Sequence, residues 1–262
     1  MQLMHNMKFT LLLCLIISKL TFAQKDSIYT DINSAFNNPD SVYILNLWGK
    51  TNVTYTKFPI EIIQFKNLRE LHLCCHKIDS IPEAIKLLDK LELFNFDDNP
   101  IGYFPEVLLE MKSLTNLSLR RCGISIIPDS ISILNNLKYL DLGVNQITEI
   151  PKTLFKLNYL TELDLVENKI NLIHSNISEL QSLQILKLRS NKISKLPSSI
   201  FKLQKLENIE LCSNKIVKLP KSIQKMRNLK VVDLTHNPIT TKELNKIRSK
   251  LPKCKITNDK CI

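Results

Sequence analysis

Residues 137–151 read LKYLDLGVNQITEIP, and this stretch decides the fold. Its leucines follow the spacing L-x-x-L-x-L, which puts Leu140 and Leu142 on one face of a short strand. Tyr139 and Asp141 then lie on the opposite face. A strand with one apolar face has nothing of its own to bury that face against. The rest of the chain must therefore supply neighbouring copies.

The copies recur with a constant period of 23 residues. The first leucine of the stretch returns at Leu68, Leu91, Leu114, Leu137, Leu160, Leu183, Leu206 and Leu229. Each unit reads L-x-x-L-x-L-x-x-N-x-I-x-x-(I/L)-P-x-x-I-x-x-L-x-x, and its places are numbered 1–23 from that leucine. An earlier unit beginning at Val42 carries three extra residues, which makes nine units. Such units bury their leucines only between neighbours, so the pattern predicts a stacked, quasi-one-dimensional solenoid.

The repeat resembles that of leucine-rich repeat proteins of the 23-residue kind, a class found in Ras-scaffold proteins, plant intracellular relatives and many bacterial proteins. The resemblance covers residues 41–240. It implies an α/β solenoid: a right-handed horseshoe with a concave parallel β-sheet and about nine repeats. We expect the place-9 asparagines to form a ladder that satisfies backbone groups of the turn. The ladder is expected to be weakest near the N-terminus, where Lys50, His76 and Cys122 occupy place 9.

The two ends depart from the repeat. Residues 1–23 combine Met7-Lys8, an apolar run and a small residue at Ala23, which predicts a secretory signal peptide cleaved after Ala23. Residues 24–40 are expected to form an N-terminal cap with a short helix from Asp31 to Phe36. Residues 241–262 are expected to form a C-terminal cap, a helix followed by an edge strand. The predicted location is secreted, periplasmic or cell-surface, and a cytoplasmic location is the alternative if the leader is not a signal.

Export would expose the cysteines outside the leader to an oxidising compartment. Most of them are scattered through the repeats without the spacing of a disulfide framework. Cys254 and Cys261 are the candidate pair.

Charge is distributed unevenly over the predicted solenoid. The formal charge is +11, yet places 3, 5, 7 and 8, which should face the concave side and be free to bind, carry nine acids against four bases. The surplus lysines therefore lie on the loops and the outer side. A nucleic-acid groove would gather its basic residues where the ligand lies, so we predict no nucleic-acid partner. We expect no membrane association once the leader is removed.

The predicted partner is another protein or a peptide, bound by the concave surface. Tyr139, Arg120 and Arg189 rank first because interaction hot spots favour tyrosine and arginine. The full predicted contact set is Arg120, Arg121, Tyr139, Asp141, Glu162, Asp164, Lys187, Arg189 and Glu210.

Several common enzyme motifs are missing from the sequence. It contains no glycine-rich phosphate loop, no H-E-x-x-H and no G-x-S-x-G. The segment from His72 to His76 reads HLCCH and could hold a transition metal with Asp97 one strand away. The simpler interpretation is that His76 replaces a ladder asparagine and the others are variable surface positions. We therefore predict no enzyme, no metal site, no cofactor and no small-molecule substrate.

These observations favour a non-enzymatic, exported recognition module. Two alternatives remain open. One is an intracellular signalling scaffold like the Ras-associated relatives, and the other is a surface adhesin that uses the basic outer side.

Overall fold

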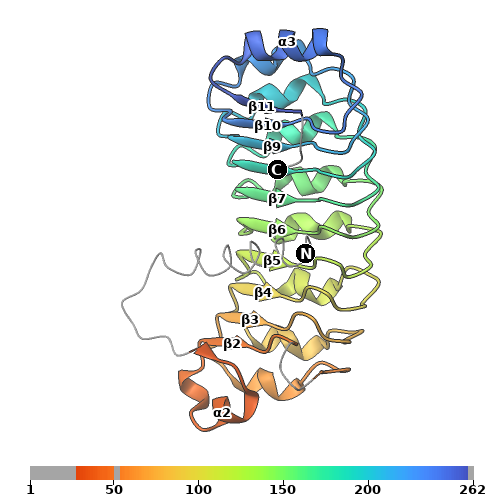
Figure 1. Cartoon of the computed structure of the whole chain (residues 1–262). Coiled ribbons are helices and arrows are strands. Elements are labelled where there is room, and N and C mark those ends of the chain that lie inside the picture. The colour runs from red at the N-terminus through yellow and green to blue at the C-terminus, as the bar shows by residue number, and fades with distance from the viewer. Residues whose placement is uncertain (1–27, 50–53, 259–262) are drawn as a thin grey trace.

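The computed structural model describes residues 28–49 and 54–258. The predicted signal peptide and Cys261 lie outside the described residues. Eleven parallel strands form one sheet in chain order (Figure 1). The strands are β1 (Ile28–Tyr29), β2 (Ile44–Asn46), β3 (Glu70–His72), β4 (Leu93–Asn95), β5 (Asn116–Ser118), β6 (Tyr139–Asp141), β7 (Glu162–Asp164), β8 (Ile185–Lys187), β9 (Asn208–Glu210), β10 (Val231–Asp233) and β11 (Lys255–Thr257).

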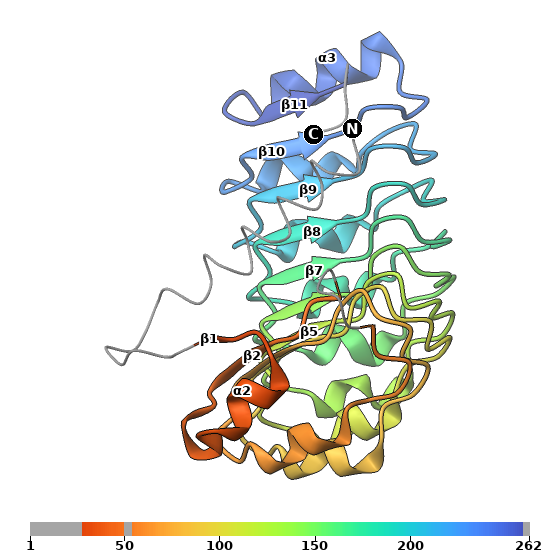
Figure 2. The same cartoon turned by 60° about the horizontal axis from the view of Figure 1, so that its bottom comes forward.

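Short helices lie on the side of the stack opposite the sheet (Figure 2). Most are five-residue 3-10 helices that begin directly after the place-15 proline. Proline suits this position because its φ is fixed and it has no N–H to leave unpaired. The 3-10 helices are η1 (Pro39–Ser41), η2 (Ile60–Gln64), η3 (Glu83–Leu87), η4 (Glu106–Glu110), η5 (Asp129–Ile133), η6 (Lys152–Lys156), η7 (Ser175–Glu179), η8 (Ser198–Lys202) and η9 (Lys221–Lys225).

The register of the sheet keeps equivalent places side by side. Tyr139 pairs with Glu162 and Asp141 with Asp164 between β6 and β7. Leu137, Leu140 and Leu142 are all fully buried, as are their counterparts in most other units. Burial of a leucine side chain contributes about 1.5–3 kcal/mol, so each unit is stabilised chiefly by its two neighbours. The predicted leucine-rich repeat solenoid is confirmed.

The asparagine ladder is present, and each rung joins two units. Asn168 Nδ2 donates to the carbonyls of Leu142, Leu165 and Val166 at 3.0–3.2 Å, and its Oδ1 accepts from Ile147 N at 2.9 Å. Asn99, Asn145, Asn191, Asn214 and Asn237 repeat this arrangement.

Two of the residues that replace asparagine at place 9 turn inward as well, and the third, Lys50, lies outside the described residues. His76 Nε2 lies 2.6 Å from Leu47 O, and Cys122 Sγ donates to Phe96 O at 3.4 Å. The prediction that His76 is a ladder substitute is confirmed. His76 and Cys122 each make two side-chain hydrogen bonds to backbone atoms, against four for Asn168, which agrees with a weaker ladder near the N-terminus.

Both ends of the stack carry a helix. At the first unit, α2 (Ile32–Phe36) is capped by Asp31, whose side chain accepts from Ser34 N at 2.8 Å. At the last unit, α3 (Thr241–Lys250) is capped by Thr240. These helices and the edge strand β11 were expected from the sequence. The two-residue β1 was not, because it lies outside the repeat and has no apolar pattern of its own.

One backbone feature has no signal in the sequence. Place 8 adopts a left-handed conformation in eight consecutive units, with φ between 51° and 65° and no glycine among them. The residues are Cys75, Asp98, Arg121, Val144, Glu167, Ser190, Ser213 and His236. L-residues rarely adopt this conformation, and it is least favourable for a β-branched side chain such as Val144. It turns the chain from the strand toward the buried asparagine, so stacking imposes it on whichever residue occupies the place.

Candidate functional site

The predicted contact set lies together along β5 to β9 and the turns that follow these strands. The structure contradicts the expectation that all of these side chains are free of the core. Asp141 is 1% exposed, Asp164 is 6% exposed and Glu162 is 7% exposed. We call this buried and half-buried part of the concave side the floor, and define it as Arg120, Tyr139, Asp141, Glu162, Asp164, Lys187 and Glu210.

Arg120 holds one half of the floor together. Its Nη1 lies 3.5 Å from Asp141 Oδ1 and 3.8 Å from Asp164 Oδ1, so one guanidinium serves carboxylates on two adjacent strands. Tyr139 adds a hydrogen bond from its hydroxyl to Asp141 Oδ2 at 3.3 Å. Opposite charges at this level of burial must remain paired, because an unpaired buried charge is costly.

Lys187 holds the other half. Its Nζ lies 2.5 Å from Glu162 Oε1 and 3.7 Å from Asp164 Oδ2. Asp164 therefore lies between Arg120 and Lys187 and joins the two halves. Burial, opposed by the charge of Lys187, raises the pKa of Glu210 to about 7. Burial and then the nearby Asp164 raise the pKa of Asp141 well above its ordinary value.

The place-5 carboxylates also have a structural role. Asp141 Oδ1 accepts from Gly143 N at 2.7 Å, and Asp164 Oδ1 accepts from Val166 N at 3.0 Å. Asn95 and Asp233 make the same bond to the N–H two residues ahead. Asn and Asp commonly close a turn in this way. The polar residue at place 5 of each of these four units is thus explained by its role in closing the turn.

Exposed ion pairs border the floor where the strands end. Arg121 Nε lies 2.7 Å from Asp98 Oδ1, and their side chains are 53% and 40% exposed. Arg189 Nη2 lies 3.1 Å from Glu167 Oε1, and their side chains are 24% and 42% exposed. We call these four residues the rim. Asp98 and Glu167 are absent from the predicted contact set, although their charges, opposite to those of Arg121 and Arg189 in the next unit, could have suggested the pairing.

The HLCCH segment does not assemble a metal site. His76 faces the ladder, and His72 Nε2 lies 3.8 Å from Glu70 Oε2. Within residues 28–49 and 54–258, no group of three or more His, Cys, Asp or Glu side chains could hold a metal ion. Trp48 Nε1 instead donates to Cys75 Sγ at 3.1 Å. The hydrogen bond with Cys74 lowers the pKa of Cys75 to about 7, against the effect of burial and with help from Trp48.

Among the described residues Cys254 is a free cysteine, and Cys261, the other member of the predicted pair, lies outside them. Cys212, buried after β9, is disulfide-bonded. Cys212 could not be singled out from the sequence, because it occupies a variable place of an ordinary unit.

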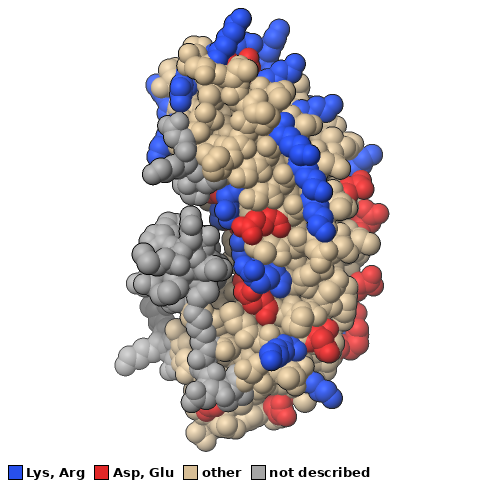
Figure 3. Space-filling model, turned by 45° about the vertical axis from the view of Figure 1, so that its right-hand side comes forward, with Lys and Arg blue, Asp and Glu red and all other residues tan. Residues whose placement is uncertain are grey.

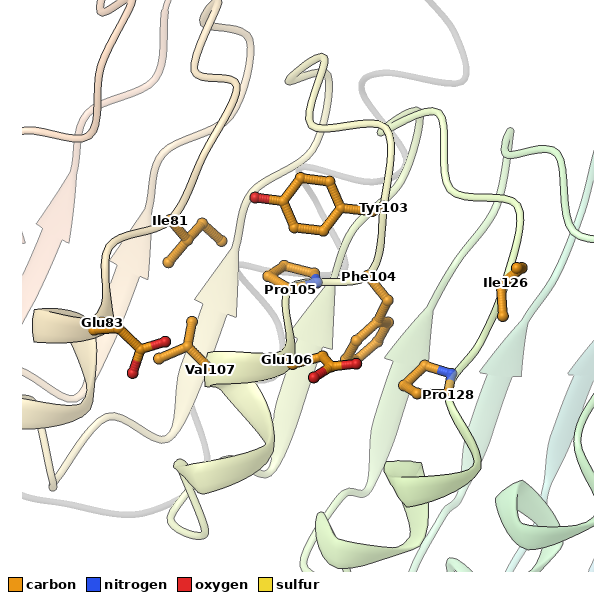
Figure 4. A pocket seen from close by; sticks show the side chains of 9 residues that line it. All are labelled: Ile81, Glu83, Tyr103, Phe104, Pro105, Glu106, Val107, Ile126 and Pro128. Atoms are coloured by element: carbon orange, nitrogen blue, oxygen red, sulfur yellow. The ribbon is translucent and has the colours of Figure 1, made fainter.

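A separate groove of about 460 Å³ lies on the lateral edge of the N-terminal half (Figure 4). Tyr103 and Ile126 occupy place 13 of adjacent units and are 52% and 73% exposed. Pro105 and Pro128 form part of its wall, and Glu83 and Glu106 lie at its border. Apart from Glu83, Glu106 and the hydroxyl of Tyr103, the side chains that line it are apolar.

Comparison with known proteins agrees with this geometry. A sequence model described as leucine rich repeat matches residues 112–170 and 181–239. A leucine-rich repeat protein of Leptospira interrogans is 32% identical with a TM-score of 0.72, and the match covers 84% of this chain and 62% of that one. This is a leucine-rich repeat protein. Among curated proteins, a search finds no match to the chain.

Two further solved structures share the fold of this leucine-rich repeat protein. An internalin of Listeria monocytogenes is 25% identical with a TM-score of 0.69, over 87% of this chain and 63% of that one. The ectodomain of an Arabidopsis thaliana receptor kinase, solved in complex with Casparian strip integrity factor 2, is 21% identical with a TM-score of 0.60 over 84% of this chain and 32% of that one. The leucine-rich repeat protein thus spans less than two thirds of each of these relatives. No helix in its described residues is long and apolar enough to cross a membrane.

Proposed function

We propose that this leucine-rich repeat protein is an exported, non-enzymatic module that binds another protein or a peptide on the concave side of its sheet. The rim carries the proposal. Two partly exposed arginine–carboxylate pairs stand beside a floor whose charges are already paired within the chain. A partner would therefore meet the rim first, while the floor fixes its position.

The floor and the rim are already ordered in the free protein, which favours binding. The floor is held by ion pairs that join two units each, and the turns below the rim are fixed by the asparagine ladder. A surface that is ordered before binding loses less conformational entropy when a partner arrives. Arginine is also enriched among residues that dominate binding energy.

Other proteins with this fold provide a general precedent for protein binding. Leucine-rich repeat folds are commonly protein-binding modules, and the plant ectodomain was solved with a bound factor. That ectodomain shares the fold alone with this chain. The identity of a partner therefore has to come from capture experiments.

We expect the double variant Arg121→Ala/Arg189→Ala to weaken partner binding about tenfold or more, because each arginine supplies a partly exposed charge to the contact. Exposed ion pairs contribute roughly 0–1 kcal/mol, so the melting temperature should change little. The partner would be captured from culture medium and cell-surface fractions, identified by mass spectrometry, purified and titrated against both proteins.

The matched control is Lys156→Ala/Lys202→Ala, which removes two exposed charges on the 3-10 helices η6 and η8. It should leave binding unchanged. A partner that binds the rim variant as tightly as the wild type, or is lost equally from the control, would contradict the concave placement. Tyr139→Ala is less useful here, because Tyr139 bonds Asp141 and its removal would disturb the floor.

Export is the second part of the proposal. The predicted leader supports it, and so does the Cys212 disulfide, because disulfides persist mainly in oxidising compartments. We expect the mature protein to begin at Gln24 and to appear outside the cytoplasm. N-terminal sequencing of the protein from each cell fraction measures this. Intact protein confined to the cytoplasm would instead favour the intracellular scaffold.

A further inference from the structure

The lateral edge of the C-terminal half carries a row of lysines. Lys169, Lys192 and Lys215 occupy place 10 of three consecutive units, and we call these three the lysine row. Lys195 and Lys218 flank it at place 13. All five side chains are exposed. Figure 3 shows basic side chains gathered in a line along this edge, in the half of the solenoid that ends in α3.

The backbone fixes the spacing of the row. Lys192 N donates to Ile170 O, and Lys215 N donates to Ile193 O, both at 2.8 Å. Lys169 N makes the equivalent bond to Ile147 O at 2.8 Å. These bonds join neighbouring units directly, so successive lysines lie about 5 Å apart at the backbone, as neighbouring strands do. The row is therefore a straight series of positive charges with the period of the repeat.

The row repeats one sign of charge in three consecutive units. At other places, some lysines pair with an acid one unit away, as Lys86 does with Glu110 and Lys230 with Glu207. Within the part of the chain that the structure describes, the row forms no ion pair, and its one side-chain bond runs from Lys169 to the neutral amide of Gln146 at 3.4 Å. Like charges placed side by side are mutually unfavourable. A bound anion would relieve that repulsion.

The excess charge extends beyond the row. Residues 142–258 carry 21 Lys and Arg against 9 Asp and Glu, whereas residues 28–141 carry 11 against 14. Glu167, an exposed acid two residues before Lys169, is already paired with Arg189. The C-terminal half thus presents one basic edge to solvent, separate from the rim and floor.

We propose that the lysine row binds a linear acidic polysaccharide lying parallel to the solenoid axis. A single file of evenly spaced point charges fits a chain with an acidic group on successive sugars. Lysine is suited to this because it acts as a point charge and does not require the bidentate geometry that arginine provides.

The surroundings of the row favour a polysaccharide over nucleic acid or a membrane. Places 10–13 of the three units read KINL, KISK and KIVK and contain no aromatic residue on which bases could stack. A bilayer surface would call for a broad basic patch on an amphipathic face rather than a line one residue wide.

The test compares the wild type with Lys169→Gln/Lys192→Gln/Lys215→Gln, using polygalacturonate and heparin as probes. We expect the triple variant to weaken binding to both polymers about tenfold or more at moderate salt, and to lower the salt dependence of binding, because three charge contacts are removed. Polygalacturonate whose carboxyl groups are methyl-esterified should bind neither protein.

The matched control is Lys156→Gln/Lys202→Gln/Lys205→Gln, which removes the same charge from exposed positions away from the row. It should lose much less affinity, and circular dichroism should show all three proteins folded. Equal losses in both triple variants would overturn the proposal, because binding would then follow net charge alone. It would also be overturned if single-stranded DNA or anionic vesicles bound more tightly than both polysaccharides and depended equally on the row. Partner binding through the rim is measured separately and should be unchanged in the row variant.

Discussion

Replacing Asn168 with alanine should lower the free energy of unfolding by roughly 3–5 kcal/mol, the largest effect of any single change considered for this protein. The side chain makes four hydrogen bonds to buried backbone groups: it donates to Leu142 O, Leu165 O and Val166 O and accepts from Ile147 N. Alanine leaves Ile147 N without its acceptor in a buried turn. It also removes one of the two hydrogen bonds that each of the three carbonyls accepts, since Leu142 O keeps the bond from Asn145 Nδ2, Leu165 O that from Asn191 Nδ2 and Val166 O that from Val144 N. Denaturation by urea, followed by circular dichroism, measures the loss.

Asn171→Ala is the matched control. Asn171 stands three residues further along the same unit and is exposed, so the same chemical change there should alter stability by less than about 0.5 kcal/mol. Asn168→Asp retains the acceptor and removes the donor, so it should be less damaging than alanine when the carboxyl is protonated at low pH. A loss at Asn168 no larger than that at Asn171 would show that the ladder does not stabilise the stack.

Arg120→Met should destabilise the protein by about 3–4 kcal/mol at pH 8. The substitution leaves Asp141 and Asp164 as neighbouring buried carboxylates without the guanidinium that lies 3.5 Å and 3.8 Å from them. Methionine retains much of the side-chain volume, so the loss of stability comes mainly from removing the positive charge of Arg120. Chemical denaturation at pH 8 and pH 5 measures it.

The sign of the pH dependence of the stability of Arg120→Met follows from the pKa of Asp141. Burial and the like charge of Asp164 already raise the pKa of Asp141 in the folded state above its unfolded value. Removing Arg120 raises that pKa further. The folded variant therefore binds more protons than the unfolded chain, and its stability rises as the pH falls from 8 toward 5. The deficit relative to the wild type should be clearly smaller at pH 5.

The double variant Arg120→Met/Asp141→Asn should recover much of the loss at pH 8 and flatten its pH dependence. Asparagine retains the oxygen that accepts from Gly143 N. Lys230→Met, which breaks the exposed pair with Glu207, is the control and should cost less than about 1 kcal/mol. An equal deficit for Arg120→Met at both pH values would show that packing, and not charge, explains the effect.

Much of the fold could be predicted because its signal is repeated. The leucine period identified β2 to β10 as equivalent, and the asparagine at place 9 indicated the ladder that the structure contains. The end helices were also predicted, since Asp31 and Thr240 are recognisable N-caps. The strand β1 was missed because two residues carry no periodic pattern, and its pairing with β2 depends on contacts distant in sequence.

The sequence predicted which candidate residues lie together, but not that several of them are buried and paired. The places beside the leucines do bring Arg120, Asp141, Asp164 and Lys187 together, as the 23-residue period requires. Their burial was not foreseen, because a single sequence shows which residues share a face and not which of them pair. The pairing depends on distances between units that only the stacked chain sets.

The sequence by itself therefore determined the repeat, the order of the strands and the face on which each side chain lies, because these follow from local spacing. Only the tertiary structure decided which charges are neutralised within the chain and which remain exposed. Arg120 and Lys187 became part of a buried floor, Arg121 and Arg189 became a rim, and Lys169, Lys192 and Lys215 became an unpaired row. The physical reason is that ion pairing and burial depend on neighbours 23 residues away, which the stacking of units brings within a few ångströms.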